Sequence, residues 1–566
     1  MKIKERSGSI SIMAFGPEFV RGLRATLNER LPWRVAKVEG GDDWVALKVS
    51  HDDSWLLISW GTGTGGCCMA DGRSILALRK GAPARTPLAE ALRSRFVKAD
   101  IVAVRQLNRD RVLEFEVRRR VAAGTEVRYR LVLEATEPQG NLVLLDSARR
   151  IEELARHAAP ERNPYRTLLP GHSYAPPPEF SGTVPEALDS LEPDEVMNIA
   201  GLGRPLLRLI RDHWEERSPE AWLSAVREAD SDLPLPCQRT DKGYLTRFSV
   251  PFPEAEPLGS DTLAAAERGV LFPLLERGRD RRLRQLDARL KRAVKARERH
   301  KDGLLKQLKD CAEAEVLRRK GELLLAHLGA VPERAESVVL TDWEGSRLEI
   351  ALDPHLSPSR NADRYFKKYR KAKGDPEAIR QGIAELESAM EELAQQRDLL
   401  EAIDDPEGFE EAIRDIEEWL SPEKVHKIQK RSGKGKNALP PHLSFERGGL
   451  TVLVGLSARG NRFVTFKQAK SDDLWLHAHE LPGAHVVIRG ARGREELETE
   501  HRDVLEFAAA LAAAHSKGKH AGSVPVDYTE RRYVRSVPGT VALVTYTNPG
   551  TLRIEPANEQ KAWISQ

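Results

Sequence analysis

Two long stretches of this chain carry apolar residues at helical spacing, and a pair of long helices constrains the fold more than any other feature. The first runs roughly from Thr262 to Leu328 and is broken only by glycines and Pro273. It keeps an imperfect heptad-like seam at Leu283, Leu286, Leu290, Val294, Leu304 and Leu308. The second repeats more regularly, with Arg397 at one core position, through Ile379, Ile383, Leu386, Met390, Leu393 and Leu400.

These two stretches, joined by a small lobe over Gly329–Arg360, predict an antiparallel coiled-coil arm within residues 262–420. A helical bundle domain is the alternative. A helix of about 50 residues would reach roughly 75 Å, which suits a protein that bridges parts of a large assembly.

The remaining segments predict a multidomain α+β protein, because 566 residues are too many for a single hydrophobic core. Residues 1–180 form an expected mixed α/β domain, and 181–261 carry short helical patterns around the turn Gly201-Leu202-Gly203. A basic linker over 421–445 precedes a compact α/β module at 446–566. Expected strands and helices are Trp44–Val49, Ser54–Trp60, Thr86–Phe96 (helix), Arg111–Val117, Val127–Glu134, Asn141–Leu145, Leu450–Gly455, Arg462–Lys467, His485–Ile488, Asp503–His515 (helix) and Thr540–Tyr546.

Charge and cysteine usage exclude several classes of protein. The net charge is only +3, so affinity for nucleic acid must come from local basic clusters. Cys67, Cys68, Cys237 and Cys311 form no CxxC pair, which favours a reducing compartment and argues against a zinc finger. The N-terminus lacks an apolar run of signal-peptide length, and the chain has no run of about 18 apolar residues. We therefore expect a cytoplasmic protein without membrane contact.

The stretch "DDLWLHAHELPGAHVVIRG", Asp472–Gly490, is the densest group of chemically active side chains. A metal-dependent nuclease or hydrolase would use His477, His479 and His485 and could add Asp473, although no cysteine lies nearby. Recognition of a large partner is the other interpretation, with Trp475 as a stacking face and a sharp turn at Pro482-Gly483. A buried, hydrogen-bonded core remains a third possibility for the same residues.

Basic and aromatic residues mixed near the C-terminus favour binding to RNA, through phosphate contacts and base stacking. The basic members include Lys517 and Lys519, and a solvated surface is the alternative. The Gly201-x-Gly203 turn could hold a phosphate on its backbone N–H groups, as in helix-hairpin-helix modules, or could be a purely structural turn.

Several long motifs, in order along the chain, resemble those of the NFACT family. The strongest is "DLWLHAHELPGAHVVI", which is similar to the D-x-W-x-H and P-G-x-H-V signature of the family's C-terminal NFACT-R module. "NRDRVLEF" resembles the family's Asp-Arg motif and places it at Asp110 and Arg111. Further similar segments are Gly140–Asp146, Leu168–Pro178, Leu352–Gly374, Gly455–Ala469, Ala508–Lys519 and Val524–Val534.

The resemblance implies an NFACT-N domain, a helix-hairpin-helix region, a coiled-coil arm and an NFACT-R module. It implies binding to obstructed large ribosomal subunits (23S rRNA) that carry peptidyl-tRNA, and recruitment of aminoacyl-tRNA, in bacterial members alanyl-tRNA, for C-terminal tailing without mRNA. The ribosome would supply peptidyl transfer, so no catalytic residue, metal, cofactor or small-molecule substrate is expected.

We accordingly assign tRNA engagement to Asp110 and Arg111. An arginine can donate two parallel hydrogen bonds to a phosphate or a base edge, and an aspartate can orient the guanidinium. An internal ion pair between the two residues is the alternative. RNA or ribosome binding is assigned to Asp473, Trp475, His477, Pro482, Gly483, His485, Lys517 and Lys519. A surface adhesin is a weaker interpretation, because the N-terminus does not look like a secretion signal.

Overall fold

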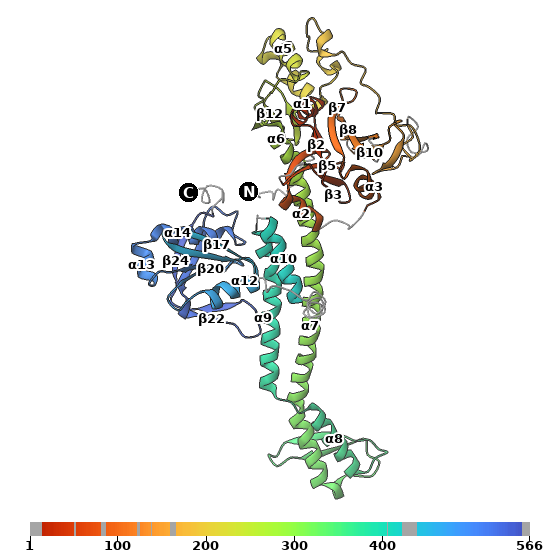
Figure 1. The fold of residues 1–566 in the computed structure, drawn as a ribbon. Helices are drawn as coiled ribbons and strands as arrows, with labels where there is room; N and C mark the ends of the chain where they lie inside the picture. The colour runs from red at the N-terminus through yellow and green to blue at the C-terminus, as the bar shows by residue number, and fades with distance from the viewer. Residues whose placement is uncertain are drawn as a thin grey trace. The chain divides into compact units, whose positions relative to one another are not determined.

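The chain divides into two compact units, Met1–Arg282 and Leu283–Gln566, each of which is described here by itself (Figure 1). The computed structural model describes residues 14–49, 53–80, 86–121, 125–136, 138–158, 166–403, 406–420 and 439–556. The basic run expected at 424–436 lies outside these residues. Among the described helices, none has an apolar stretch long enough to span a bilayer.

Three sheets build the described part of the N-terminal unit. The first is antiparallel and has the order β3 (Lys37–Gly40), β4 (Trp44–Lys48), β5 (Ser54–Ser59), β6 (Gly66–Asp71). The second is also antiparallel, with the order β11 (Ile151–Leu154), β10 (Asn141–Leu145), β9 (Glu126–Glu134), β8 (Val112–Arg120), β7 (Asp100–Gln106), β2 (Trp33–Arg34). The third is mixed, with the order β1 (Ala14–Phe15), β13 (Tyr244–Arg247), β12 (Cys237–Arg239), β14 (Glu256–Gly259).

Helices cover these sheets, and the described part of the unit holds three hydrophobic cores, of which the smallest surrounds Val132 and Val143 of the second sheet. The main core joins the first two sheets to helices before and after them, while a second core holds the helical segment around the fully buried Trp222. Helix starts follow local chemistry: Thr86 Oγ1 accepts from the N–H of Ala89, as the sequence predicted, and Pro87 occupies the first helical position. The helical elements of this unit are α1 (Pro17–Asn28), α2 (Gly72–Lys80), α3 (Pro87–Phe96), η2 (Pro185–Ala187), η3 (Val196–Asn198), α4 (Arg204–Asp212), η4 (Trp214–Glu216), α5 (Pro219–Ala229) and α6 (Thr262–Gly269).

The long helix expected from Thr262 is present, and its break falls at one of the glycines that the prediction named. Helix α6 ends at Gly269, and α7 (Leu271–Ala326) begins after Val270. Pro273 lies in the first turn of α7, where a missing N–H removes no helical hydrogen bond.

The C-terminal unit contains an antiparallel pair made by α7 from residue 283 onward and α9 (Pro376–Glu401) (Figure 1). Asp287 pairs with Arg397 and Lys301 with Glu387, so positions rise on α7 as they fall on α9. Leu283, Leu286 and Leu290 are buried, as the heptad spacing predicted. Arg397, which the spacing placed at a core position, is instead a surface residue: its side chain is 52% exposed and pairs with Asp287.

A small lobe with its own core joins the two helices. Leu323 and Leu324 of α7 pack against Ile350 and Tyr365 there. Its elements are η5 (Leu328–Ala330), the hairpin β15 (Ser337–Thr341) and β16 (Arg347–Ala351), and α8 (Pro358–Ala372).

A six-stranded sheet forms the C-terminal module, with one helix layer on each face. Its order is β17 (His442–Arg447), β18 (Leu450–Gly455), β20 (Val486–Arg489), β19 (Leu474–Ala478), β21 (Val524–Glu530), β24 (Gly550–Ile554). Leu474 and Leu476 face the core that contains α14 (Arg502–Ala514), whereas Trp475 faces the opposite core with Val464. The other elements of this unit are α10 (Pro406–Leu420), α12 (Ala458–Phe463), η6 (Val464–Gln468), α13 (Arg494–Thr499), η7 (Arg531–Tyr533), β22 (Val534–Ser536) and β23 (Val544–Tyr546).

Two strand predictions in this module are wrong. Arg462–Lys467 is helical, because Ser457 Oγ accepts from the N–H of Gly460 and starts α12, which continues into one π-helical turn, η6. The strand expected from Thr540 starts only at Val544, since the N–H groups of Val541 and Ala542 donate to Glu392 rather than to a neighbouring strand.

Candidate functional site

A tight hairpin turn between β7 and β8 presents the predicted Asp-Arg pair. Asn108 and Arg109 both have left-handed backbone angles, φ 53° and 48°, as the two central residues of a turn in which the N–H of Asp110 donates to the carbonyl of Leu107 at 3.0 Å. This turn lies within the four-residue loop 108–111, which Leu107 and Val112 close. Asparagine tolerates this conformation, and Asn108 Nδ2 donates to the carbonyl of Pro177 at 2.7 Å. For Arg109 the conformation costs about 1 kcal/mol or more, so other contacts must hold the turn in place.

Ion pairs of Arg109 supply those contacts. Its guanidinium binds Asp230 and, at 3.3 Å, Glu186. Asp230, at the end of α5 and only 1% exposed, also binds Arg21. Burial, with the nearby charge of Arg109, lowers the pKa of Arg21 to about 10. The network therefore fastens the β7–β8 turn to the helical segment that follows the second sheet.

Asp110 and Arg111 remain partly exposed next to this anchored turn. The carboxylate of Asp110 accepts the backbone N–H of Arg111 at 2.7 Å, and the carbonyl of Asp110 accepts from Gln106 Nε2 at 2.9 Å. The two side chains approach each other only to 3.9 Å, from Nε to Oδ1. Among the described residues this is the only partner recorded for the Arg111 guanidinium, so its two terminal nitrogens can bind another group.

The Gly201-x-Gly203 turn begins α4 and is joined to α1 by a buried carboxylate. The N–H of Gly203 donates to Glu18 Oε2 at 2.9 Å, and Tyr244 Oη donates to Oε1 at 3.0 Å. Gly201 has φ 79°, a conformation that suits glycine. This N–H group of Gly203 is thus paired within the fold, and the buried turn lines the cavity described next.

One cavity of about 490 Å³ brings together the two motifs that sequence reasoning had singled out separately. Asp110 and Arg111 line it from the hairpin, and Gly201 and Gly203 from the start of α4. Arg109, Arg204 and the exposed ring of Phe180 also line it. Arginines beside a helix N-terminus attract a phosphate, and an exposed aromatic ring can stack on a base.

Sequence reasoning missed Arg109, Arg204 and Phe180 as cavity residues. Arg109 could have been found from its place in "NRDR", where asparagine marks a turn and the next residue shares it. Phe180 follows a proline-rich crossing and carries no local signal of its place in this cavity, because that place depends on the tertiary fold.

The C-terminal signature begins with two buried residues. Asp473 is 3% exposed, and its carboxylate accepts the N–H groups of Lys470 at 2.7 Å and Gly490 at 3.3 Å. Trp475 is fully buried and stacks on His477, with ring centroids 5.7 Å apart. Trp475 therefore offers no stacking face at the surface, which corrects that part of the prediction.

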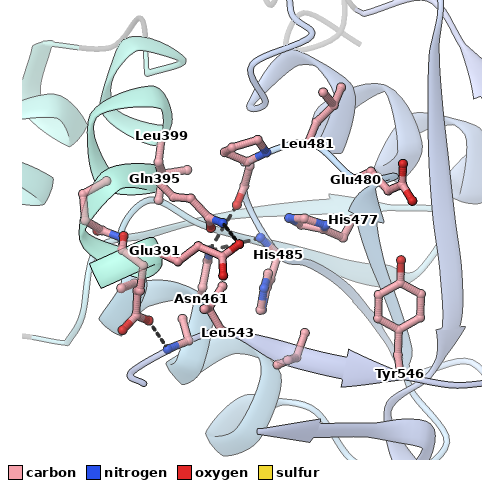
Figure 2. Close-up of a pocket in the computed structure, with 17 residues that line it drawn as sticks. Glu391, Gln395, Leu399, Asn461, His477, Glu480, Leu481, His485, Leu543 and Tyr546 are labelled. Carbon is pink, nitrogen blue, oxygen red and sulfur yellow. Dashed lines mark hydrogen bonds between the residues drawn. The ribbon is translucent and has the colours of Figure 1, made fainter. Parts of the chain in front are cut away.

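His477, Pro482, Gly483 and His485 line a second cavity, which lies within the C-terminal unit (Figure 2). His485 Nδ1 lies 2.9 Å from Thr465 Oγ1, and the rings of His477 and His485 meet edge to face at 5.4 Å. Burial lowers the pKa of His477 to about 4 and that of His485 well below its usual value. Both imidazoles are therefore neutral at neutral pH.

Lys517 and Lys519, predicted to bind RNA, reach the arm in this structure. Lys517 Nζ pairs with Asp398 at 3.1 Å, and Lys519 Nζ donates to the carbonyl of Glu401 at 2.7 Å. The Pro482-Gly483 turn is held beside them, because the N–H of Lys517 donates to the Pro482 carbonyl at 2.9 Å.

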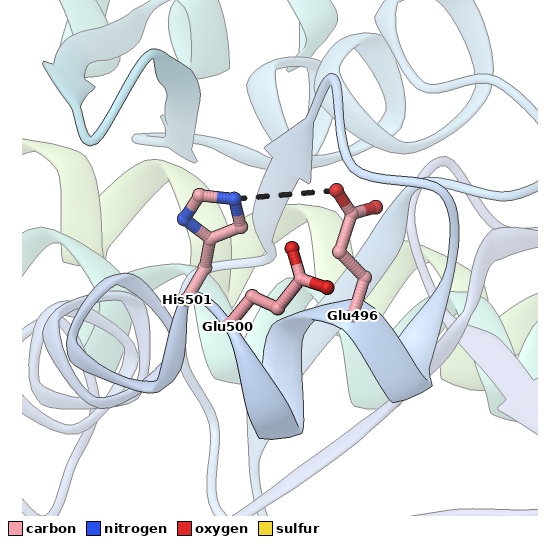
Figure 3. Close-up of side chains that lie close together, drawn as sticks. All are labelled: Glu496, Glu500 and His501. Atoms are coloured by element: carbon pink, nitrogen blue, oxygen red, sulfur yellow. Dashed lines mark ion pairs between the residues drawn. The ribbon is translucent and has the colours of Figure 1, made fainter.

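The predicted metal alternative needs three ligands that converge, and the three histidines do not supply them. His479 Nδ1 pairs with Asp527 at 2.6 Å, while His485 binds Thr465. Within the described residues, the one convergent group of three or more such side chains is Glu496, Glu500 and His501 (Figure 3). It lies around the end of α13, outside the histidine motif; Glu500 is exposed, whereas Glu496 and His501 are partly buried.

Comparisons with a family model and with known proteins point to the same family. The family described as NFACT N-terminal and middle domains matches residues 19–207 and 275–437. Rqc2 homolog RqcH of Streptococcus suis (strain 05ZYH33) is 31% identical over 485 residues, covering 83% of this chain and 85% of the relative. Rqc2 homolog RqcH of Bacillus subtilis (strain 168) is 30% identical over 490 residues, covering 81% and 83%.

Among solved structures, the N-terminal part of the fibronectin/fibrinogen-binding protein from Streptococcus suis aligns with a TM-score of 0.37 and 23% identity, over 44% of this chain and 96% of that one. The family match extends over more than half of the sequence, and the curated relatives align with most of it. The chain belongs to the NFACT family.

Proposed function

We propose that this protein is a ribosome-associated quality control factor. It binds obstructed large ribosomal subunits that carry peptidyl-tRNA, and it recruits aminoacyl-tRNA, namely alanyl-tRNA, for C-terminal tailing of the stalled chain without mRNA. Membership of the NFACT family and similarity to RqcH proteins support this role.

The observation that carries the proposal is the cavity of the N-terminal unit, where the Asp110-Arg111 hairpin faces the start of α4. Arg111 and Arg204 line it together with Asp110 and Glu179, and the Arg111 guanidinium is only loosely paired, whereas the charge of Arg109 is offset by Asp230 and Glu186. Such a site can grip a phosphate while Asp110 accepts a hydrogen bond from a base amino group. It would hold a backbone and one neighbouring base of a folded RNA.

Peptidyl transfer is assigned to the ribosome, so the protein acts by positioning tRNA. The arm suits docking on a large particle, because two long paired helices carry at their turn a small lobe with its own core. The proposed partners are 23S rRNA, peptidyl-tRNA and alanyl-tRNA.

Affinity purification of the full-length protein from its native host, followed by sequencing of the bound RNA, tests this proposal. We expect large-subunit rRNA and one dominant tRNA species. The double variant Asp110→Ala/Arg111→Ala should lose the tRNA while it still copurifies with large subunits, because the changed side chains lie only at the hairpin.

Arg128→Ala is the matched control, since Arg128 lies on β9 of the same sheet, outside the cavity lining, and its 56% exposed side chain pairs with Glu126 at 3.2 Å and with Glu116 at 3.9 Å. It should keep both RNAs. Recovery of neither large-subunit rRNA nor tRNA with the unaltered protein would refute the function. A dominant tRNA other than the alanine acceptor would refute the alanyl-tRNA assignment alone.

A further inference from the structure

The cavity of the C-terminal unit has room for a single side chain rather than for a larger ligand. It lies between α9 and the strands that carry the histidine motif, and its volume is about 270 Å³ (Figure 2). Sites for drug-sized ligands are usually larger, about 300–1,000 Å³. Leu399 and Leu481 supply apolar walls, and Tyr546 supplies an aromatic one.

The charge around this cavity is negative. Glu391, Glu392 and Glu480 line it, and none of the described residues that line it is a lysine or an arginine. The Glu392 carboxylate is occupied by the N–H groups of Val541, at 2.7 Å, and Ala542. Glu391 and Glu480 are exposed at the rim, where they would repel a phosphate and attract a cation.

A buried acceptor without a partner points to the ligand. Gln396 lines the cavity and is 4% exposed. Its Nε2 donates to the carbonyl of Glu392 at 3.2 Å, so the amide cannot be turned around without bringing two oxygens together. Its Oε1 has no partner among the described residues. A buried carbonyl oxygen left unpaired is costly, and a ligand with N–H donors would satisfy it.

The histidines do not oppose a cation here, because both stay neutral at neutral pH. Tyr546 Oη donates to Asp527 at 2.7 Å, so a carboxylate also lies behind the aromatic wall. Aromatic faces attract a cation over the ring, and a planar guanidinium stacks on such faces better than an ammonium does.

We propose that this cavity binds the guanidinium of an arginine side chain of a protein partner. Five N–H donors in one plane can reach the Gln396 Oε1 and the rim carboxylates together, while the apolar walls take the stem of the side chain. The inference goes beyond the proposed tRNA role and does not depend on it, because it concerns a separate cavity in the other unit.

Binding of a blocked amino acid to the full-length protein tests the proposal. The probe is N-acetyl-arginine amide, compared with N-acetyl-citrulline amide, which has nearly the same shape without charge, and with N-acetyl-lysine amide. Ring signals of ¹⁵N-labelled histidine are followed by NMR. We expect the His477 and His485 signals to shift saturably with the arginine probe, and at least about tenfold weaker binding of the citrulline probe.

Gln396→Leu should weaken arginine binding by about tenfold without harm to folding, because it removes an unpaired acceptor and keeps the volume. Gln381→Leu is the control on the same helix: Gln381 is exposed and bonds only to Glu385, so binding should not change. Glu391→Gln/Glu480→Gln should weaken binding further and reduce its dependence on salt.

Three results would overturn the proposal. The first is an absence of saturable shifts at millimolar arginine probe. The second is equal binding of arginine and citrulline probes, which would mean that charge is not read. The third is a preference for adenosine monophosphate, which would make the cavity a nucleotide site. The proposed function is tested separately by copurification of tRNA, which does not involve Gln396. Loss of the tRNA would therefore count against the proposed function and not against the arginine site.

Discussion

The backbone N–H of Gly203 donates a 2.9 Å hydrogen bond to Oε2 of Glu18, and this contact joins the start of α4 to a carboxylate buried in α1. Tyr244 completes the arrangement by donating to Oε1. Burial raises the pKa of Glu18, and the hydrogen bonds from Gly203 and Tyr244 partly offset that effect. The wall of the N-terminal cavity is therefore built on an ionisable side chain of the core.

Gly203→Ala should disrupt this wall. A Cβ at position 203 would lie 1.6 Å from Tyr244 Oη, so the ring must move and its bond to Glu18 must break. We expect the free energy of unfolding of the N-terminal unit to fall by about 2 kcal/mol, as for overpacking of a core. Urea unfolding, with hydrogen exchange of α4 peptides, measures it.

Gly278→Ala is the control for that experiment. Gly278 lies within α7 with nothing within 4 Å of an added Cβ, so alanine should stabilise the helix by about 0.5–1 kcal/mol. Equal free energies of unfolding of the Gly203→Ala and unaltered proteins would show that the cavity wall accommodates the added methyl group without loss of stability.

Asp230→Asn should destabilise the N-terminal unit strongly. Asp230 is buried and binds both Arg21 and Arg109, and removal of its charge leaves a buried arginine without its counter-ion. Loss of one partner of a buried ion pair costs about 3–5 kcal/mol. Thermal unfolding with hydrogen exchange of the β7–β8 hairpin should show the turn opening first.

Asp232→Asn provides the comparison, two residues away. Asp232 pairs with Arg24 at the surface, with its side chain 57% exposed, and such pairs contribute about 0–1 kcal/mol. Similar losses for the two variants would mean that the buried network does not hold the hairpin.

Local patterns predicted much of the fold. The spacing of Leu283, Leu286 and Leu290 located a buried seam, and β10 and β18 match their predicted bounds, because alternating or continuous apolar runs report burial directly. The strand prediction for Arg462–Lys467 was wrong because the β-branched and aromatic residues of this segment suit a strand. The cap at Ser457 and packing against Trp475 stabilise a helix there instead.

The candidate sites were harder to predict for a related reason. Asp110 and Gly201 each appeared in a motif, but their meeting in one cavity depends on the anchoring of Arg109 to Asp230, a contact between distant segments. The sequence predicted that Trp475 offers a stacking face. The alternation of β19 instead points its ring into a core that also contains Val464 of η6, a segment predicted as a strand.

The buried histidines should make the C-terminal unit sensitive to acid. Burial lowers the folded-state pKa of His477 to about 4, below its ordinary value, and His485 shifts in the same direction. Because the unfolded chain then binds more protons, stability is full above about pH 6.5 and falls as the pH drops towards 4. Each histidine contributes a slope of at most about 1.4 kcal/mol per pH unit.

Urea unfolding between pH 5 and 7.5, followed by hydrogen exchange of peptides from β19 in the C-terminal unit, would measure this slope. His485→Gln should flatten it, whereas His520→Gln, at an exposed position, should leave it unchanged. His479 acts in the opposite direction, because Asp527 raises its pKa and its contribution is lost as the pH rises. A slope that His485→Gln does not alter would assign the acid sensitivity to other groups.

Arg111→Ala should change how tRNA binding depends on salt. If Arg111 contacts one phosphate, its removal should lower affinity for all tRNA species and reduce the slope of log K against log[KCl] by about one unit. Arg111→Lys should retain the slope, since one charge remains. It should bind less tightly, because an ammonium cannot donate two parallel hydrogen bonds to a phosphate as a guanidinium does. Filter binding of purified tRNA over a KCl series measures both quantities. Arg128→Ala should match the unaltered protein in both, since Arg128 lies outside the cavity lining. An unchanged slope in Arg111→Ala, with weaker binding, would instead assign Arg111 to a base contact.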